Sequence, residues 1–341
     1  MSRKLQLFFF VVGMAVLVWM VTHIGAARLV GDFRRAGWLM IPIVLSWAPA
    51  YALFTWTWMI VMADEPNRPP FLDAFAITVS GFAINWVTPL VAIGGEPFKV
   101  AAAASWIGTR RAAGSIILFT MIHALSNLVI WLIAALIGLW VFRGDPEVAG
   151  PLVLLSILFG GLIWLVMAGH QKGYLGRILS VMHKLPLLRR LARTIEPKRD
   201  TLLALDEQIV DFYHARPLRF FAAVAIDLAG RAIAMLEFWF ILLALGIDAG
   251  YLTAFLIGNF SSFVVLLFFF MPFAVGSKEG SLFLVTRLLG MSSGVAVFTA
   301  MASRLRELAW IAIGFALMWV AGRGPRRPKE VTAGDVAPGE M

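Results

Sequence analysis

Long apolar segments constrain the fold of this chain more than any other feature. Eight segments, separated by polar connections, are long enough to cross a bilayer as helices: 5–21, 38–62, 71–88, 112–142, 151–168, 218–245, 252–271 and 295–320. Apolar residues make up 60% of the chain and charged residues 14%. A soluble protein would instead alternate apolar and polar residues at amphipathic spacing. The sequence therefore predicts an all-α polytopic membrane protein with eight clear transmembrane helices.

Two further segments, 89–108 and 272–290, are long enough to cross but are interrupted by Gly and Pro and contain Glu and Lys. They fit either broken spans or re-entrant half-helices. If both cross, the chain has ten crossings with both termini in the cytoplasm, and most Lys and Arg then lie in cytoplasmic connections, as the positive-inside rule expects. Arg28, Arg34 and Arg35 would lie on the outer side in that arrangement and argue against it.

The predicted organisation is one membrane bundle over 1–322 and a disordered cytoplasmic tail over 323–341. The first apolar segment is interpreted as a retained helix rather than a cleaved signal peptide. A polar connection over 169–219 contains ten Lys or Arg and is expected in the cytoplasm. Within it, apolar residues recur at helical spacing over 202–212, which fits an amphipathic helix at the membrane surface or a helix packed on the base of the bundle.

The two interrupted segments resemble each other. "DAFAITVSGFAINWVTPLVAIGGEPFK" and "TAFLIGNFSSFVVLLFFFMPFAVGSKEG" both begin with Ala-Phe, and both place a glutamate seven residues after a proline, Pro89 to Glu96 and Pro272 to Glu279. In the ten-crossing arrangement the copies start on opposite sides of the membrane, so halves of about 38–142 and 220–320 would form an inverted repeat. A chance match is the competing explanation. The predicted backbone breaks are Pro89, Gly94, Gly95, Pro97, Pro272, Gly276 and Gly280.

Charged residues inside the apolar segments mark the candidate site. A charge at the centre of a span costs about 2.5–3.5 kcal/mol on insertion scales, so each one needs a partner or a wet cavity. The residues expected to line a head-group site are Glu96, Lys99, Lys278, Glu279, Arg304, Asn85, Asp227 and Arg231.

Structural explanations compete for several of these residues. Glu96 with Lys99, and Asp227 with Arg231, have the spacing of ion pairs within one helix. Asn85 and Asn259 are of the type that hydrogen-bonds between membrane helices. His123, on one face with Asn127, is expected to be a hydrogen-bonded interior histidine.

Arg304 is the residue of the last span for which a ligand-binding role is favoured. Glu307 can pair at full strength with only one of Arg304 and Arg306. An unpaired guanidinium facing a cavity would suit bidentate binding of phosphate or carboxylate.

Composition excludes several classes of function. The chain contains no cysteine, which removes disulfides, thiolate metal sites and cysteine nucleophiles. It contains no G-x-x-x-x-G-K-[ST] loop, so ATP hydrolysis is not expected. The net charge of +9 lies in loops beside the spans, where anionic lipid heads rather than nucleic acid would meet it. No metal or other cofactor is expected.

The motifs resemble a known family. "NWVTPLVAIGGEPFKV", followed by "GTRRAAGS", and the later "MPFAVGSKEGSLFLVTRLLGMSSGVAVFTAMASRLRELAW" are similar to the two signatures of the lysylphosphatidylglycerol synthase transmembrane (flippase-type) family, over about 5–322. The glutamate-lysine form of the first signature is closest to the hopanoid-biosynthesis branch. The second departs from the commoner P-G-G-[LIV]-G-x-x-E form. The resemblance implies a stand-alone member without the aminoacyltransferase domain, so synthesis of lysyl-lipid is not implied.

The function expected from the residues and the resemblance is that of a lipid translocase in a bacterial inner membrane. It would bind a lipid head group at a midplane site formed by the two broken helices. Its expected partners are anionic phospholipid or hopanoid and proteins of lipid biosynthesis. An integral membrane enzyme that uses two glutamates as acid and base, and a secondary transporter of a small solute, are the alternatives.

Overall fold

The protein is described from a computed structural model that covers residues 34, 37–87, 94–170, 215–268 and 276–321. The predicted first span, the predicted amphipathic helix at 202–212, the tail, Pro89 and Pro272 lie outside these residues. Within them, every regular element is a helix. The elements are η1 (Gly37–Leu39), α3 (Met40–Leu45), α4 (Trp47–Val61), α5 (Phe71–Val87), α6 (Gly95–Ile107), α7 (Thr109–Val141), α8 (Pro146–His170), α12 (Pro217–Ala234), α13 (Leu236–Ala244), α14 (Tyr251–Leu267), α15 (Ser277–Leu288) and α16 (Ser293–Ala321).

The predicted all-α polytopic membrane fold is confirmed. Three helical stretches among the described residues, Gly37–Val61, Thr109–Val141 and Pro146–Met167, are long and apolar enough to cross a membrane, and α5 and α14 are shorter apolar helices. The helix α7 has 33 residues and is about 50 Å long, more than the thickness of a bilayer's hydrocarbon core.

Two predicted spans are divided in the structure. The span predicted at 38–62 breaks at Ser46, between α3 and α4. Pro49 explains this break, because proline lacks the N–H that would bond to the carbonyl of Leu45 and its ring crowds that carbonyl. The span predicted at 218–245 breaks at Met235, between α12 and α13, where the sequence has neither Pro nor Gly.

The two interrupted segments each contain a short helix. The helix α6 has 13 residues and α15 has 12, so they are about 20 and 18 Å long. Neither helix alone spans a hydrocarbon core of about 30 Å. The structure thus has short helices where the sequence predicted interrupted ones.

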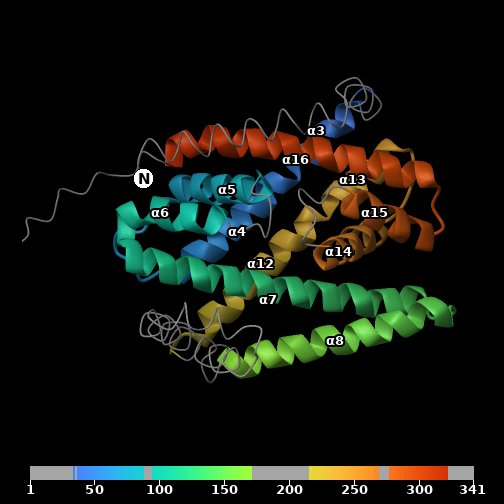
Figure 1. The fold of residues 1–341 in the computed structure, drawn as a ribbon, viewed down its shortest axis with the longest axis horizontal. Helices are drawn as coiled ribbons and strands as arrows, with labels where there is room; N and C mark the ends of the chain where they lie inside the picture. The colour runs from blue at the N-terminus through green and yellow to red at the C-terminus, as the bar shows by residue number, and fades with distance from the viewer. Residues whose placement is uncertain (1–33, 35–36, 88–93, 171–214, 269–275, 322–341) are drawn as a thin grey trace, which may run out of the picture.

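The helices on the two sides of the connection at 169–219 follow a similar order and pair in a matching way. Each half contains a 17-residue helix, a short helix and a long helix in that order: α5, α6, α7 and α14, α15, α16. The helix α5 packs along α16 and α14 packs against α7, while α4 packs against α12. In Figure 1, α7 and α16 lie at opposite sides of the body and run in opposite directions. This arrangement is the one expected of inverted halves.

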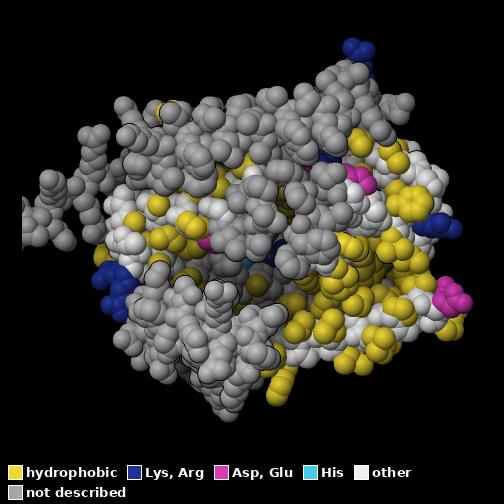
Figure 2. Space-filling model, viewed as in Figure 1, with side chains coloured by type: hydrophobic (Ala, Val, Ile, Leu, Met, Phe, Trp, Pro, Cys, Tyr) yellow, Lys and Arg dark blue, Asp and Glu magenta, His cyan; other side chains and the backbone are white. Residues whose placement is uncertain are grey.

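Charged side chains gather at the ends of the long axis. In Figure 2, Lys and Arg stand out at the left end of the described surface, both basic and acidic residues stand out at the right end, and a broad hydrophobic area covers much of the right half. At one end, Glu65 accepts a hydrogen bond from Arg111 at 2.9 Å, and Asp64 pairs with Arg216 and, at 2.9 Å, with Arg219. These pairs join the end of α4 to the starts of α7 and α12.

Candidate functional site

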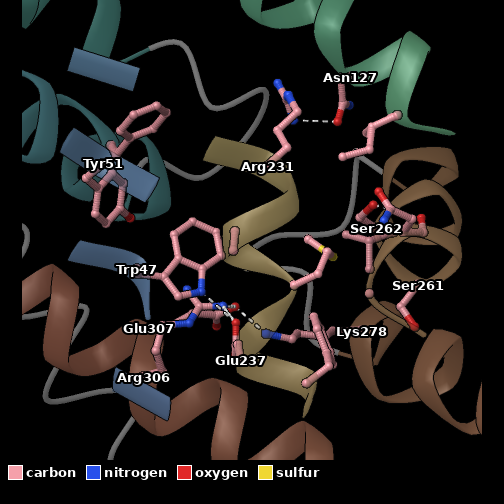
Figure 3. A pocket seen from close by; sticks show the side chains of 18 of the residues that line it. Trp47, Tyr51, Asn127, Arg231, Glu237, Ser261, Ser262, Lys278, Arg306 and Glu307 are labelled. Carbon is pink, nitrogen blue, oxygen red and sulfur yellow. Dashed lines mark hydrogen bonds and ion pairs between the residues drawn. The ribbon is translucent and has the colours of Figure 1, made fainter. Parts of the chain in front are cut away.

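A cavity of about 320 Å³ lies in the middle of the bundle. Residues of α4, α5, α7, α12, α13, α14, α15 and α16 line it, so both halves of the repeat contribute. Its aromatic lining includes Trp47, Tyr51, Phe54, Phe82 and Trp86. The volume lies at the lower end of the range of small-molecule pockets, about 300–1,000 Å³. Figure 3 shows two polar groups on different sides of this space.

One polar wall is an ion network formed by α13, α15 and α16. Lys278 donates to Glu307, and Arg306 Nη2 lies 2.9 Å from Glu237 Oε2. All four side chains are buried and line the cavity. The indole Nε1 of Trp47 also donates to Glu237 Oε2, at 2.7 Å. The network therefore holds charges of both signs against each other beside an open space.

Some buried atoms of this network have no hydrogen-bond partner among the described residues. These atoms are Nε and Nη1 of Arg306 and Oε1 of Glu237. The guanidinium of Arg306 lies over the ring of Trp47, 4.1 Å from its centroid. An unsatisfied buried donor or acceptor costs about 1–3 kcal/mol, and more when it is charged. Water or a polar ligand in the cavity would remove that cost.

Arg304 is not the unpaired guanidinium that the sequence suggested. Its Nη1 donates to Glu307 at 3.1 Å, and its Nε and Nη2 both lie 3.2 Å from Glu279 Oε1. The prediction was wrong because Glu279, 25 residues away in sequence, supplies the second carboxylate. The guanidinium with unpaired nitrogens on the cavity is that of Arg306.

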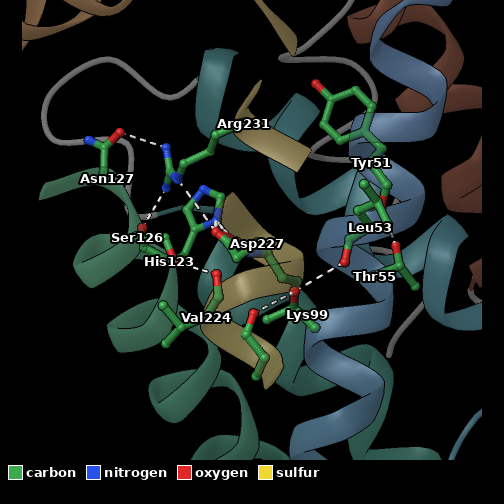
Figure 4. Close-up of polar contacts among 12 residues, drawn as sticks. Tyr51, Leu53, Thr55, Lys99, His123, Ser126, Asn127, Val224, Asp227 and Arg231 are labelled. Carbon is green, nitrogen blue, oxygen red and sulfur yellow. Dashed lines mark hydrogen bonds and ion pairs between the residues drawn. The ribbon is translucent and has the colours of Figure 1, made fainter. Parts of the chain in front are cut away.

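The other polar wall joins α7 and α12. His123 Nδ1 lies 2.7 Å from Asp227 Oδ1, and Arg231 Nε lies 3.4 Å from Asp227 Oδ2. Arg231 also donates to Asn127 Oδ1 at 2.6 Å and to the carbonyl of His123 at 2.5 Å. Figure 4 shows Arg231 between Asn127 and Asp227. The predicted ion pair within α12 is present, and His123 is hydrogen-bonded as predicted.

The charges of the first motif form a separate cluster on α5 and α6. Lys99 Nζ lies 3.3 Å from Glu96 Oε1, and Asn85 Nδ2 donates to the same oxygen at 3.1 Å. The ammonium also lies over the rings of Phe82 and Phe119, 4.8 and 5.2 Å from their centroids. Glu96 and Lys99 thus form the structural pair within one helix that was the competing interpretation of this motif. They do not line the central cavity.

Two glycines let Lys99 lie flat on α5. A Cβ on Gly81 would lie 2.5 Å from Lys99 Cε, and a Cβ on Gly95 would lie 2.1 Å from the carbonyl oxygen of Gly81. The amide of Gly95 also donates to Asn85 Oδ1 at 2.7 Å. The role of Gly95 is therefore close approach of α6 to α5.

The other predicted breaks and asparagines fall in different settings. Gly276 precedes α15 with a φ of +82°, a conformation that suits glycine, and its N–H donates to Glu279 Oε2 at 2.8 Å. Gly280 lies inside the first turn of α15, and Pro97 lies in the first turn of α6, where proline is tolerated. Gly94 has a helical φ of −66°. Asn259 bonds to Phe255 in its own helix rather than between helices, contrary to prediction.

Glu96 and Glu279 do not meet directly. Glu96 contacts Asn85 and Lys99, whereas Glu279 contacts the amide of Gly276 and Arg304. Among the described residues no hydrogen bond or ion pair joins the two carboxylates. Of the predicted site residues, Arg231 and Lys278 line the cavity, and Asp227 supports it through Arg231 and His123.

Sequence reasoning did not include Glu237, Arg306 and the aromatic residues of α4 in the site. Glu237 pairs with Arg306 across 69 residues, a separation at which the sequence gives no spacing rule. The available indication was that a Glu stands alone within "MLEFWF", where a carboxylate needs a partner from another helix. Trp47 and Tyr51 are two of many aromatic residues in the apolar spans, and nothing in the sequence distinguishes those that line a cavity from those that do not.

Comparison with protein families gives the same assignment as the motifs. The sequence model of the lysylphosphatidylglycerol synthase TM region matches residues 6–314. The chain belongs to this family. Comparison with curated proteins found no match.

Membership in the lysylphosphatidylglycerol synthase TM region family makes the chain a multi-pass membrane protein involved in lipid handling. The matched residues include both polar walls of the cavity and the Glu96–Lys99 cluster, and they end within α16. The site described above therefore lies inside the part of the chain that defines the family.

Proposed function

We propose that this protein is a lipid translocase of a bacterial inner membrane, and that the central cavity binds the head group of the lipid during transfer. The supporting observation is a cavity in an apolar bundle whose walls carry buried charges with unpaired hydrogen-bonding atoms. A polar head group of a phospholipid or hopanoid would satisfy those atoms. Its apolar tails would stay among the exposed apolar side chains of the bundle.

Three cations on the cavity suit a phosphate. Arg306 and Arg231 each present a guanidinium, whose fork of N–H groups matches phosphate oxygens, and Lys278 adds an ammonium. Their partners, Glu237, Glu307 and Asp227, keep these charges near balance, so they are retained in the membrane without a ligand. A phosphate entering the cavity would exchange one set of ion pairs for another.

Transfer requires the cavity to face each leaflet in turn. The inverted arrangement of α5–α7 and α14–α16 around the cavity supports rocking of one half against the other as the motion. The chain has no nucleotide-binding loop, so direction would come from an ion gradient or from consumption of the transferred lipid by biosynthetic partner proteins.

Reconstitution tests the proposal. The full chain is placed in liposomes with a fluorescent phospholipid, and transfer is followed by chemical bleaching of the outer leaflet. Arg231→Gln and Lys278→Met are compared with Arg287→Gln, an exposed arginine on α15 as matched control. We expect transfer to fall at least about tenfold in the cavity variants, because a hydrogen bond to a charged group contributes about 1.5–3 kcal/mol, and to be unchanged in the control.

Other results would contradict the proposal. Transfer that is absent from wild type, or equal in all variants, would remove the translocase function. Flux of a small solute without lipid transfer would favour a secondary transporter. A chemically altered lipid, detected by mass spectrometry, would favour an enzyme.

A further inference from the structure

His123 lines the cavity, and only one of its two ring nitrogens has a hydrogen-bond partner among the described residues. Its Nδ1 lies 2.7 and 3.0 Å from the two carboxylate oxygens of Asp227, which is fully buried. An ionised carboxylate only accepts hydrogen bonds, so Nδ1 carries the hydrogen, and Nε2 of the neutral ring carries a lone pair. Among the described residues Nε2 has no hydrogen-bond partner, and His123 lines the cavity.

The surroundings of the ring are apolar except on one side. The rings of Phe54, Phe82 and Phe119 lie 4.9, 5.7 and 5.7 Å from that of His123. The charged groups that face it are Asp227 and Arg231 of α12 and Lys99 of α6. The helix α4 adds Tyr51, which lines the same cavity, and α14 adds the uncharged side chains of Asn259, Ser261 and Ser262.

Asp227 is shared between His123 and Arg231. Arg231 approaches Asp227 Oδ2 at 3.4 Å, and its Nε has no hydrogen bond to any described residue. With His123 neutral, the charges of Asp227 and Arg231 cancel. When His123 is protonated, one carboxylate faces two cations, and the group carries one net positive charge on the cavity wall.

We infer that His123 Nε2 is a proton-binding site whose occupancy is coupled to binding of a phosphate group beside Arg231. A proton from water adds to the lone pair of Nε2, and the Nδ1–H bond to Asp227 stays in place, so no covalent bond breaks. The added charge attracts a phosphate, and a phosphate bound at Arg231 in turn favours the proton. The coupling is reciprocal, as linkage between two equilibria requires.

This inference rests on the proposed function only for the source of the phosphate, which is a lipid head group there. Histidine is the side chain whose charge changes most readily within the range of cellular pH, so a proton gradient can act through it. Proton binding at His123 would let a proton gradient across the membrane drive lipid transfer. His123 of α7 and Arg231 of α12 would be coupled through the carboxylate of Asp227, which both of them contact.

Calorimetry on the full chain in detergent tests the coupling. Two probes are used, dioctanoyl phosphatidylglycerol and dimethyl phosphate, both phosphodiesters that do not titrate near neutrality. Binding is measured in two buffers of different ionisation enthalpy, which gives the number of protons taken up for each ligand. We expect uptake of a fraction of one proton at the acidic end of the range and an affinity that rises about fivefold or more between about pH 8 and about pH 5.

Variants locate the proton. His123→Gln keeps a side-chain amide for Asp227 but cannot titrate, and should bind without proton uptake. His183→Gln, in the polar connection, is the matched control and should behave as wild type. Melting temperatures check that both variants fold. If His123→Gln does not fold, the wild-type protein still tests the inference. Ligand binding without proton uptake by the wild type would overturn it.

The outcomes separate this inference from the proposed function. Uptake with the lipid probe alone supports a site for lipid head groups, and uptake with both probes supports a phosphate site that also accepts soluble anions. Lipid transfer in liposomes without proton uptake would retain the translocase and remove the proton site. Proton uptake without lipid transfer would do the reverse. Uptake that persists in His123→Gln would place the proton elsewhere and overturn the inference.

Discussion

In the first half of the chain, the short helix α6 satisfies its charges locally. Asn85 and Lys99 both donate to Glu96, and the ammonium of Lys99 lies over aromatic rings. In the second half, the short helix α15 sends Lys278 and Glu279 to α16, where they meet Glu307 and Arg304. The charges of the motif thus pair within the short helix in the first half. In the second half they pair with the following long helix, and Lys278 lines the cavity.

The difference comes from the long helix that follows each short helix. At mid-length, α16 carries "RLRE", whereas α7 carries His123 and Asn127. Three charges on α16 can hold charges from α13 and α15 at once. At its mid-length α7 offers only neutral polar groups, and its ionic contact there comes from Asp227 of α12. Two helices at corresponding positions, α16 and α7, therefore contribute different polar groups to the two walls of one cavity.

The largest expected effect is that of Glu307→Gln, which breaks the network of the second half. Glu307 is buried and accepts from Lys278 and Arg304. Removing its charge leaves buried cations without compensation, and we expect a loss of about 3–5 kcal/mol in stability. The melting temperature in detergent measures it, with the exposed Glu147→Gln as control. Equal melting temperatures for the two variants would show that the network does not stabilise the fold.

Gly95→Ala should have the next largest effect and act on the first half. The new Cβ would lie 2.1 Å from the backbone oxygen of Gly81, which cannot move as a flexible side chain would. We expect a loss of about 3 kcal/mol, at the upper end for overpacking. Gly150→Ala on α8, where a Cβ meets open space, is the control for the same thermal measurement. A tolerated Gly95→Ala would mean that α5 and α6 separate freely.

The sequence predicted most of the fold because a bilayer forces apolar segments to be helices, and apolar length can be read directly. The segments at 71–88, 112–142, 252–271 and 295–320 agree with α5, α7, α14 and α16 within a few residues. The break at Met235 was not predictable, since no residue there disfavours a helix. Its cause lies in tertiary packing rather than in local chemistry.

The site was predicted less completely, for a related reason. Pairs close in sequence, such as Glu96 with Lys99 and Asp227 with Arg231, follow from helical spacing. Arg306 with Glu237 is a contact between distant helices, and spacing says nothing about it. The sequence could identify which buried charges need partners but could not choose the partners, and this explains why Arg304 was expected to be free and Arg306 was not.

A smaller effect should separate the two members of the first-half pair. Lys99 is buried, whereas the side chain of Glu96 is 28% exposed. Glu96→Gln leaves a buried ammonium without an anion, and we expect a loss of about 2–3 kcal/mol. Lys99→Met leaves a carboxylate that water can reach, and we expect a loss below about 1 kcal/mol. Melting temperatures of the two variants test this, and that of Glu96→Gln should be the lower. A lower melting temperature for Lys99→Met would show that Glu96, rather than Lys99, needs its partner.

Two glycines at the start of α15 should have small effects that differ in sign. Gly276 has a φ of +82°, so Gly276→Ala should cost about 1–2 kcal/mol. Gly280 lies inside the helix, where a Cβ would meet open space, so Gly280→Ala should add about 0.5–1 kcal/mol of stability through helix propensity. Thermal melting measures both. If Gly280→Ala stabilises the fold while slowing lipid transfer in liposomes, flexibility of this first turn belongs to the transfer step. If it stabilises without slowing transfer, α15 works as a rigid wall, and motion lies between the halves instead.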